Sequence, residues 1–571
     1  MVRRLILSLA GLWRSLVYRL IGRRLRFPWL EIEIRGSLPE SGDGFDLLGY
    51  LMGRRQTEVS LLDLLTVLRA AARDENLRAV LISIGTLECG FARIEEIAVA
   101  ISEVREAGKR IVVVAEHLGL KEYRLACEAD RIVLAPQGGL SIAGTGADVT
   151  FFRGLLDKFG IEPQLLHRGD YKSASELLTE KSISAPHRKM LDELLGDLFR
   201  QLATAVALRR GLSTEVALRI LGDGPYTASR ALEMRLVDAL GHAPDERERI
   251  RLELATTDTI TTGQGNEIKG AGYGQYLRLA ALRARQEIRS SDGVALLHIE
   301  GTITSGEGIR DAREARSTGS KSVVRAVEAI RKNRRIKALV LRVNSPGGSG
   351  LASDVMLAAL SRLEIPVVIS MGDVAASGGY YVAANRKFRI YAGAGTITGS
   401  IGVIAGKIAL AGLYEKLGLG HAHVGHGTSS NYFSAHTPWT PEQLARTERD
   451  IDEFYRDFVG KVAEARGRTF EEIHEVAQGR VWTGAQARER GLVDEVGGLR
   501  AALNTARTLA GLPEGAIRIF SRFQRRPRLP LRLAVEFPDE PVAGLLPELK
   551  IWNSLAHDRL LALMPWRLRI Y

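Results

Sequence analysis

Apolar residues recur along the chain in short runs that alternate with segments of helical spacing. Residues 29–35 alternate between apolar and polar positions, residues 293–300, which include an apolar run, open the second copy in the same way, and each stretch precedes a loop and a predicted helix. A continuous apolar run follows in both places, at 79–84 and at 338–343. Short apolar runs between helical patterns are typical of buried parallel strands. The pattern therefore predicts an α/β protein built from βαβ units, in which the same order of strand, loop, helix and strand begins each half of the chain.

In the second half, a predicted helix at 351–363 leads to a buried strand at 367–371, and Ser377 follows at the start of another helical pattern. A helical run at 276–288 lies between the two halves. Strands and helices thus keep alternating up to Ser377, as parallel βαβ units require.

The two halves also match residue by residue. Pro225–Asp238 aligns with Val481–Asp494 at an offset of 256, and Gly119 aligns with Ser377 at an offset of 258. A period of this length is far longer than that of solenoid repeats. We therefore expect a tandem duplication of a whole domain.

Each copy lacks a residue that the other keeps. Ser377 is framed by small residues, and Gly119 stands in its place in the first copy. The same offset of 258 pairs Ser430 of the second copy with Lys172 of the first. One half would thus supply a nucleophile and the other a base. This complementary loss is what we expect in a serine-lysine hydrolase whose domain was duplicated.

The repeat also gives the expected domain boundaries. A central stretch and both ends of the chain match nothing in the other copy. The expected segments are a basic amphipathic N-terminal segment (1–28), the first repeat with the lysine (29–242), a partly ordered helical connector (243–290), the second repeat with the serine (291–512) and a basic, apolar C-terminal extension (513–571).

The formal net charge of +12 is concentrated near the ends of the chain. Residues 1–26 hold seven arginines and residues 516–533 hold six, with no acidic residue in either stretch, which accounts for the whole excess. A nucleic-acid-binding domain would carry its basic residues on the folded body. We therefore expect a membrane surface, and not nucleic acid, as the acidic partner.

The first segment has an apolar run of only about nine residues, Leu5–Trp13, whereas a spanning helix needs roughly 20. Helical spacing places its leucines on one face, as in an amphipathic helix that lies in the membrane interface. An uncleaved leader or a helix that packs on the protein itself would explain the same pattern. The stretch 552–566 has similar character and the same alternatives.

The sequence contains no motif that is typical of a metal site or a nucleotide site. Cys89 and Cys127, the two cysteines, form no framework, and the histidines lack metal-ligand spacing. A Walker-type glycine loop is missing as well. We expect buried thiols, no metal and no cofactor.

The candidate chemistry gathers around Ser377. Small neighbours would let a peptide backbone approach closely, and the following helix start would direct N–H groups towards negative charge. Gly347 and Gly348 close the preceding strand, so their amides, with that of Gly378, are candidate oxyanion donors.

Three motifs together resemble signal peptide peptidase A, also called protease IV, in its long duplicated Gram-negative form. They are Asn344-Ser-Pro-Gly-Gly348, Gly372-Asp-Val-Ala-Ala-Ser-Gly-Gly-Tyr-Tyr381 and Thr398-Gly-Ser-Ile-Gly-Val403. The resemblance implies a serine-lysine peptidase with tandem domains of the Clp-protease and crotonase-like ββα fold. It places Ser377 as nucleophile, Lys172 as general base and Ser400 as the hydrogen-bond partner of the lysine amine.

The same resemblance implies apolar, unfolded peptides such as signal peptides as substrates, association with the bacterial inner membrane and a homotetramer. It leaves open which side of the membrane the protein faces. It also leaves open whether Ser377 and Lys172 meet within one subunit or between neighbours.

The base must be neutral near pH 7 to accept a proton. A free lysine has a pKa near 10.4, so Lys172 has to be desolvated to act. A solvated lysine paired with Asp170 or Glu176 is the structural alternative. His426, four residues before Ser430, is a rival base.

Two further functions use the same motifs. A crotonase-like acyl-coenzyme A enzyme would share the glycine-flanked oxyanion turn, and a non-catalytic membrane scaffold would keep the motifs for structural reasons. Loss of serine reactivity on Ser377→Ala separates the peptidase from both.

Overall fold

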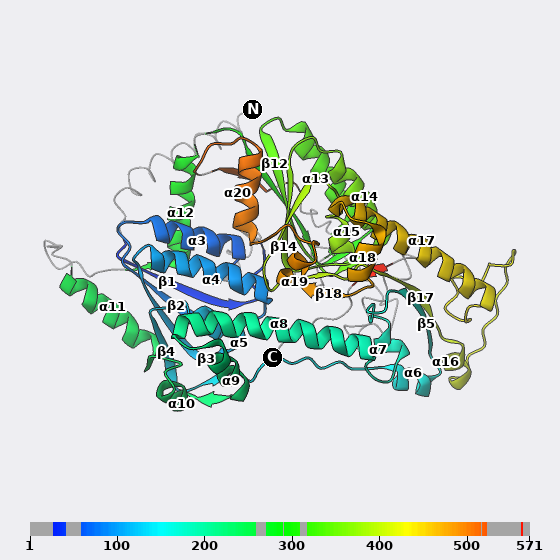
Figure 1. Cartoon of the computed structure of the whole chain (residues 1–571), viewed down its shortest axis with the longest axis horizontal. Helices are drawn as coiled ribbons and strands as arrows, with labels where there is room; N and C mark the ends of the chain where they lie inside the picture. The colour runs from blue at the N-terminus through cyan, green and yellow to red at the C-terminus, as the bar shows by residue number, and fades with distance from the viewer. Residues whose placement is uncertain are drawn as a thin grey trace. The chain divides into compact units, whose positions relative to one another are not determined.

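The chain forms two compact units. The computed structural model describes residues 27–40, 59–257, 270–288, 290–308, 317–515, 517–521, 523 and 561–563 (Figure 1). Unit 1 comprises Met1–Thr145 and Phe199–Arg289, with Tyr571, and unit 2 comprises Gly146–Leu198 and Ser290–Ile570. The segment Gly146–Leu198 therefore belongs to the same unit as the second repeat, although it lies within the first repeat in sequence.

Unit 1 is built on a seven-stranded sheet with the order β6-β4-β3-β2-β1-β8, in which β7 also pairs with β4. Its four long strands are parallel, as the βαβ pattern predicts. The strands are β1 (Trp29–Gly36), β2 (Ala79–Leu87), β3 (Arg110–Gly119), β4 (Arg131–Ser141), β6 (Tyr226–Thr227), β7 (Ala239–Leu240) and β8 (Ala271–Gly272).

The helices of unit 1 follow the apolar spacing of the sequence. In α3, the buried residues recur every three or four positions, and Ser60 caps the helix by accepting the N–H of Asp63. The helices are α3 (Leu61–Arg73), α4 (Phe91–Glu106), α5 (Leu120–Ala126), α9 (Thr214–Asp223), α10 (Ala228–Glu233), α11 (Ala243–Thr257) and α12 (Tyr273–Glu287), and α8 (Ala185–Arg210) runs from unit 2 into unit 1.

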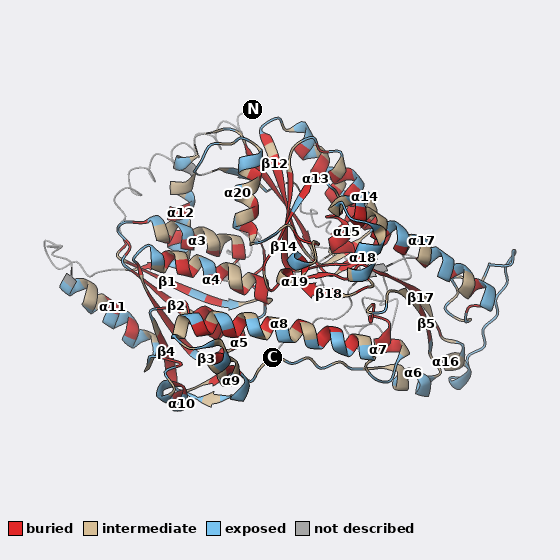
Figure 2. Cartoon of the chain, in the orientation of Figure 1, coloured by how far each residue is buried: buried red, intermediate tan, exposed pale blue. Residues whose placement is uncertain are grey.

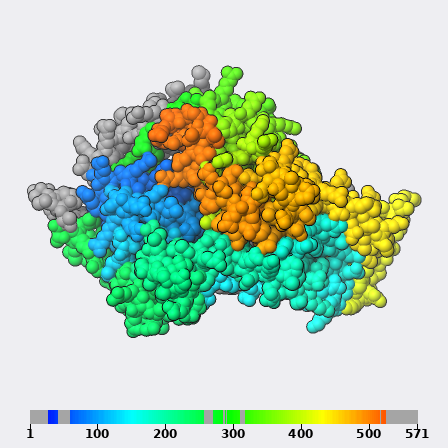
Figure 3. Space-filling view, viewed as in Figure 1, coloured from blue at the N-terminus to red at the C-terminus, as the bar shows by residue number. Residues whose placement is uncertain are grey.

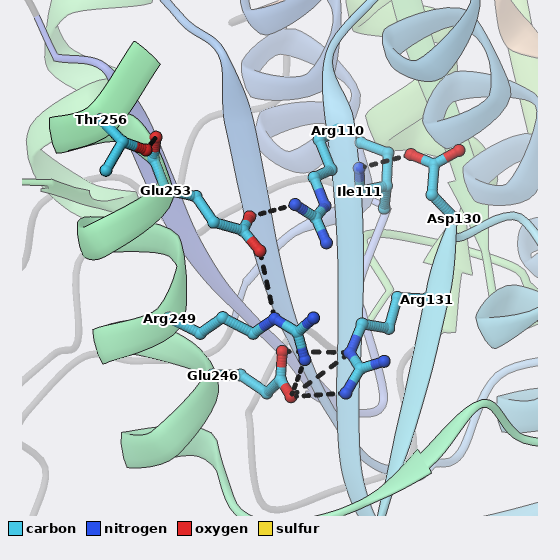
Figure 4. A network of polar contacts seen from close by, with 8 residues as sticks. All are labelled: Arg110, Ile111, Asp130, Arg131, Glu246, Arg249, Glu253 and Thr256. Atoms are coloured by element: carbon cyan, nitrogen blue, oxygen red, sulfur yellow. Dashed lines mark hydrogen bonds and ion pairs between the residues drawn. The ribbon is translucent and has the colours of Figure 1, made fainter. Parts of the chain in front are cut away.

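Ion pairs hold α11 against the sheet of unit 1 (Figure 4). Glu253 pairs with Arg110 of β3, and Glu246 pairs with Arg131 of β4 at 3.1 Å. Beside them, Ile250 packs into the apolar cluster of the strands. The helix is thus an integral part of unit 1.

Unit 2 contains a mainly parallel eight-stranded sheet with the order β18-β16-β14-β12-β9-β20, in which β15 pairs with β14 and β19. Figure 2 shows β12 and β14 largely buried. The strands are β9 (Gly293–Glu300), β12 (Ile336–Ser345), β14 (Val367–Ala376), β15 (Phe388–Ala392), β16 (Ile397–Gly399), β18 (Val481–Thr483), β19 (Glu495–Val496) and β20 (Arg518–Phe520).

Helices bury the apolar side chains of this sheet in one core. In the longest, α17, the buried residues again follow helical spacing, and a capping box at Thr440 starts the helix. The helices are α13 (Ser320–Lys332), α14 (Gly350–Ser361), α15 (Gly378–Tyr381), α17 (Pro441–Arg466), α18 (Phe470–Val476), α19 (Gly484–Glu489) and α20 (Leu499–Leu509).

A second sheet of unit 2 has six strands in the order β11-β10-β13-β21-β17-β5. Its strands are β5 (Glu162–Arg168), β10 (Thr302–Thr304), β11 (Ser317–Gly319), β13 (Gly347–Ser349), β17 (Val403–Ala409) and β21 (Leu561–Leu563). The short helices α6 (Arg153–Phe159), α7 (Glu176–Thr179) and α16 (Ala411–Lys416) also belong to unit 2. This sheet joins segments that are far apart in the sequence.

The strand and helix predictions are confirmed with small shifts at the ends. The strands predicted at 29–35, 79–84, 293–300, 338–343 and 367–371 correspond to β1, β2, β9, β12 and β14, and the helices predicted at 351–363 and 276–288 to α14 and α12. Among the described residues, no helix is both long enough and apolar enough to cross a membrane. The predicted amphipathic segment 1–26, the basic stretch 524–533 and most of 552–566 lie outside the described residues.

Candidate active site

Ser377 occupies the sharp turn between β14 and α15. Its backbone has φ +56° and ψ −117°, a conformation that costs a non-glycine residue about 1–3 kcal/mol and is found mainly at functional sites. The Ser377 N–H donates to the carbonyl of Gly399 at 2.8 Å, which holds the turn against β16. The side chain is fully buried, with 0% exposure.

Lys172 reaches Ser377 because β5 pairs with β17. The two strands are antiparallel over seven residue pairs, from Val403–Arg168 to Ala409–Glu162, and β17 begins three residues after Ser400. The chain after Arg168 therefore arrives beside Ser400, where Lys172 Nζ lies 2.9 Å from Ser377 Oγ. Both residues belong to unit 2 of a single chain.

The Lys172 amine is surrounded by uncharged oxygen atoms. It donates to Ser400 Oγ at 2.9 Å and to the Ser400 carbonyl at 3.1 Å, in addition to Ser377. Glu176 is engaged elsewhere, since it binds His187 Nδ1 at 3.0 Å and Ser184 Oγ at 2.7 Å. A salt-bridged lysine, the structural alternative, does not describe this arrangement.

Burial changes the acidity of this lysine. Lys172 is 2% exposed, and desolvation disfavours its charged form, which lowers its pKa from the ordinary 10.5 to about 7. The amine is therefore neutral in about half of the molecules at pH 7. A neutral amine within hydrogen-bond distance of a serine hydroxyl can act as a general base.

Ser400 is fixed in a second strained turn. Its backbone has φ +50°, and its N–H donates to the Arg480 carbonyl at 2.7 Å. The guanidinium of Arg480 stacks on Tyr171, at 4.8 Å from the ring centre, and on Trp482 at 4.1 Å. Arg480 thus contacts both the segment that carries Lys172 and the serine that binds its amine.

Two glycines make room for the lysine: Gly402, which belongs to the Thr398–Val403 motif, and Gly479, which the sequence analysis did not identify. Gly479 has φ +76°, and a Cβ there would lie 2.5 Å from the Lys172 Cβ. A Cβ on Gly402 would lie 3.1 Å from the Lys172 Cδ. Next to Gly479, the carbonyl of Gln478 accepts the Tyr171 N–H at 2.9 Å. Because these residues are about 230 to 310 positions from Lys172, local sequence patterns gave no signal of their contacts with this segment.

The candidate oxyanion donors differ in their availability. The Gly347 N–H donates to Ser345 Oγ at 3.1 Å, so it is already engaged. Gly348 has φ +151° and approaches Ile303 so closely that a Cβ would lie 2.1 Å from its carbonyl oxygen. Gly378 begins α15, where an N–H has no intrahelical acceptor. The amide of Gly378 is therefore a better candidate than that of Gly347, and Gly348, which lies in β13 between β10 and β21, stays a candidate.

The rival base is on an exposed segment. All residues from 415 to 430 are exposed, including His426 and Ser430, and Figure 3 shows part of this segment in yellow at the right-hand edge of the view. Ser430 Oγ lies 3.1 Å from His423 Nε2. The buried Ser377 instead contacts Lys172, so the geometry favours lysine over His426 as the base.

The equivalent position in unit 1 is a glycine with a carboxylate close by, where unit 2 has Ser377. Gly119 precedes α5 as Ser377 precedes α15. A Cβ on Gly119 would lie 2.7 Å from Glu122 Oε2, and the other carboxylate oxygen accepts the Leu87 N–H at 2.7 Å. A serine side chain would therefore collide with Glu122 here.

Comparisons with known proteins agree with the duplicated layout. Peptidase family S49 matches residues 103–256 and 359–513, one stretch in each repeat and more than half of the chain together. The serine protease SPPA, chloroplastic, of Arabidopsis thaliana is 31% identical over 85% of this chain and 71% of its own. Protease 4 of Salmonella typhi is 29% identical over 88% of this chain and 80% of its own.

Two further similarities are partial. A putative signal peptide peptidase SppA of Enterococcus faecium is 31% identical over 41% of this chain and 68% of its own. The solved structure of ClpP1 from Listeria monocytogenes aligns with 36% of this chain and 94% of its own, at 14% identity and a TM-score of 0.23.

The family match bears on the functions that the motifs left open. A match to a peptidase family in both repeats and an alignment with proteases over most of the chain support a serine peptidase rather than an acyl-coenzyme A enzyme or a non-catalytic scaffold. The chain belongs to peptidase family S49 and is a serine peptidase.

Proposed function

We propose that the protein is a membrane-associated endopeptidase in which Ser377 is the nucleophile and Lys172 the general base. The contact of 2.9 Å between Lys172 Nζ and Ser377 Oγ carries this proposal. A lysine with a pKa of about 7 supports it, because a charged ammonium could not take up the serine proton.

The proposed reaction moves one proton between the two side chains. Ser377 Oγ attacks the peptide carbonyl while its proton passes to Lys172 Nζ. The tetrahedral intermediate then collapses, the C–N bond breaks, and the ammonium returns the proton to the leaving amine. Water, deprotonated by the same amine, attacks the acyl-serine; the ester C–O bond breaks, the ammonium returns the proton to Ser377 Oγ, and the second product leaves as a carboxylic acid.

Backbone amides would stabilise the negative charge of the intermediate. The N–H groups of Gly348 and Gly378 are the proposed donors, since that of Gly347 is bound to Ser345 Oγ. Ser400 would orient the lysine, because its Oγ lies 2.9 Å from Nζ. With Ser400 in place, Nζ faces Ser377 in the geometry that the proton transfer needs.

The proposed substrates are signal peptides and other unfolded apolar peptides. The similarity to the putative signal peptide peptidase SppA of Enterococcus faecium supports this choice. The arginine-rich, leucine-rich segment 1–26 supports attachment to an anionic membrane surface, which we propose is the bacterial inner membrane. We further propose a homotetramer, in which assembly would exclude folded proteins from the site.

The proposal is tested with a fluorophosphonate probe and an unfolded protein substrate. Wild-type protein should be labelled once per chain and should degrade the substrate, and Ser377→Ala should abolish both activities. Ser430→Ala is the matched control and should behave as wild type, because Ser430 is exposed whereas Ser377 and Lys172 are buried. Labelling that persists in Ser377→Ala would assign the nucleophile to another residue.

A further inference from the structure

One turn of the second repeat lies against both the proposed base and the serine that binds its amine. Residues 478–480 form this turn between α18 and β18, and Gly479 in it has φ +76°. A Cβ on Gly479 would lie 2.5 Å from the Lys172 Cβ. The carbonyl of Arg480 accepts the Ser400 N–H at 2.7 Å. The backbone of the turn therefore contacts both residues at once.

The side chain of Arg480 binds the segment that brings Lys172 into unit 2. This segment, Gly146–Leu198 (the lysine segment), comes from the first repeat in sequence. The guanidinium stacks on Tyr171, which directly precedes Lys172, and pairs with Glu193 of α8. A planar guanidinium can do both, because it stacks through its face and binds a carboxylate through its edge. Arg480 thus contacts the lysine segment on both sides of the base in sequence.

Contacts within the second repeat fix the position of Arg480. Its guanidinium lies 4.1 Å from the ring centre of Trp482, and the side chain is only 11% exposed. Trp482 belongs to β18, which pairs antiparallel with β16, the strand that directly precedes Ser400. The arginine therefore connects the sheet that carries Ser400 with the lysine segment.

Burial is the cause of the lowered pKa of Lys172. The other titratable groups that surround it are exposed or engaged: Asp170 is exposed, Glu176 is bound to His187, and the hydroxyl of Tyr455 in α17 accepts an N–H of the turn. Looser packing of the lysine segment would admit water to the amine and raise its pKa towards the ordinary value of 10.5.

We propose that Arg480 is a positioning residue for the base, which holds the lysine segment against the turn 478–480 and so keeps Lys172 Nζ buried against Ser377. This inference rests on the proposed function, since it concerns the base of the same dyad. Arg480 acts through Tyr171 and Glu193, and takes no part in the proton transfer itself.

The lysine segment should stay bound when the guanidinium is removed. β5 pairs with β17 over seven residue pairs, and Thr483 Oγ1 donates to Asp197 Oδ2 of α8 at 2.6 Å. Arg480→Gln should therefore fold, but with water nearer to the amine. The expected rise in the pKa of Lys172 is about one unit, from about 7 to about 8.

A rise of this size changes the reaction rate in a way that depends on pH. The neutral fraction of the amine would fall about ninefold at pH 6 and about fivefold at pH 7, and would hardly change at pH 9.5. The rate of Ser377 labelling should follow the same course. A defect of structure alone would instead lower the rate by the same factor at every pH.

The experiment measures fluorophosphonate labelling of the full chain between pH 5.5 and 9.5, with kcat and KM for a quenched apolar peptide and thermal unfolding for each protein. Arg480→Gln removes the guanidinium, Glu193→Ala removes its carboxylate partner, and Arg480→Lys keeps the charge without the planar group. Arg490→Gln is the matched control, because that guanidinium stacks on the same Trp482, at 3.8 Å, but donates to the Gln486 carbonyl of α19.

The midpoint of the pH profile should rise by about one unit in Arg480→Gln, and by less in Arg480→Lys and Glu193→Ala, while KM stays unchanged. Arg490→Gln should have the wild-type midpoint. An unchanged midpoint in Arg480→Gln would overturn the inference, whatever its rate. If Arg480→Gln does not fold, Glu193→Ala decides: a raised midpoint supports the inference and a wild-type midpoint overturns it.

The same measurements separate this inference from the proposed function. If labelling of the wild type requires Ser377 and has a midpoint near pH 7 that Arg480→Gln leaves in place, the proposed dyad stands and only the role of Arg480 fails. If labelling of the wild type persists in Ser377→Ala, the proposed function fails and the inference fails with it.

Discussion

The rate at which Ser377 is acylated should follow the titration of Lys172. The amine accepts the serine proton only when it is neutral, so the rate should rise with pH. With a pKa of about 7, the neutral fraction is roughly one tenth at pH 6, one half at pH 7 and nine tenths at pH 8. The labelling rate should therefore rise about tenfold from pH 6 and level off above pH 8.

Burial of the lysine determines this profile. An exposed lysine with a pKa near 10.4 would be neutral in only about one molecule in 2,500 at pH 7. Lowering the pKa to about 7 therefore increases the reactive form by roughly three orders of magnitude. In free energy this corresponds to a desolvation penalty on the ammonium form of about 5 kcal/mol.

The assay is the second-order rate of fluorophosphonate labelling between pH 5.5 and 9.5. A histidine base would titrate in the same range, so His426→Ala is measured in parallel and should keep the profile unchanged. A rate that keeps rising tenfold per pH unit up to pH 10 would refute the reasoning, because the lysine would then be solvated. A profile that disappears in His426→Ala would transfer the base role to that histidine.

Three further predictions concern the surroundings of the dyad. Ser400→Ala removes the hydroxyl that lies 2.9 Å from Lys172 Nζ, so kcat for peptide hydrolysis should fall about 10- to 100-fold while KM stays unchanged; a wild-type kcat would exclude an orienting role. Gly479→Ala should slow Ser377 labelling more than 100-fold, because its Cβ would displace Lys172, whereas Gly467→Ala, with φ +63° and no atom within 4 Å, should label normally. Relative to wild type, Lys172→Met should be more stable at pH 7 than at pH 10, because the lysine of the unfolded chain keeps its proton to about pH 10.4 whereas that of the folded chain loses it near pH 7. Urea titrations should show that the difference in free energy of unfolding between the two proteins shrinks by roughly 4 kcal/mol from pH 7 to pH 10. A difference that stays constant would contradict the lowered pKa of Lys172.

The sequence was informative where the signal is local or where the two repeats can be compared. Apolar runs located β2, β9, β12 and β14 because buried parallel strands have few polar positions. The offset of 258 residues matched Lys172 with the position of Ser430, and the structure brings Lys172 next to Ser377. This match came from comparison of the copies, because a lone lysine carries no sign of burial.

The remaining features depend on contacts between distant segments. The pairing of β5 with β17 joins residues about 240 positions apart, and no periodicity encodes such a partner. The same holds for Gly479, whose role follows from the backbone of Lys172 lying against it. The engagement of the Gly347 amide by Ser345 Oγ depends on side-chain orientation, which a motif does not specify.

The central claim is that the amine of Lys172 deprotonates Ser377, and its most direct test is the labelling rate of Lys172→Met at pH 8. General-base catalysis contributes typically 10²- to 10⁴-fold, so the rate should fall by about three orders of magnitude in a variant that keeps the secondary structure of wild type. Lys172→Arg should be equally slow, because the guanidinium keeps its proton. Labelling of Lys172→Met at the wild-type rate would contradict the account.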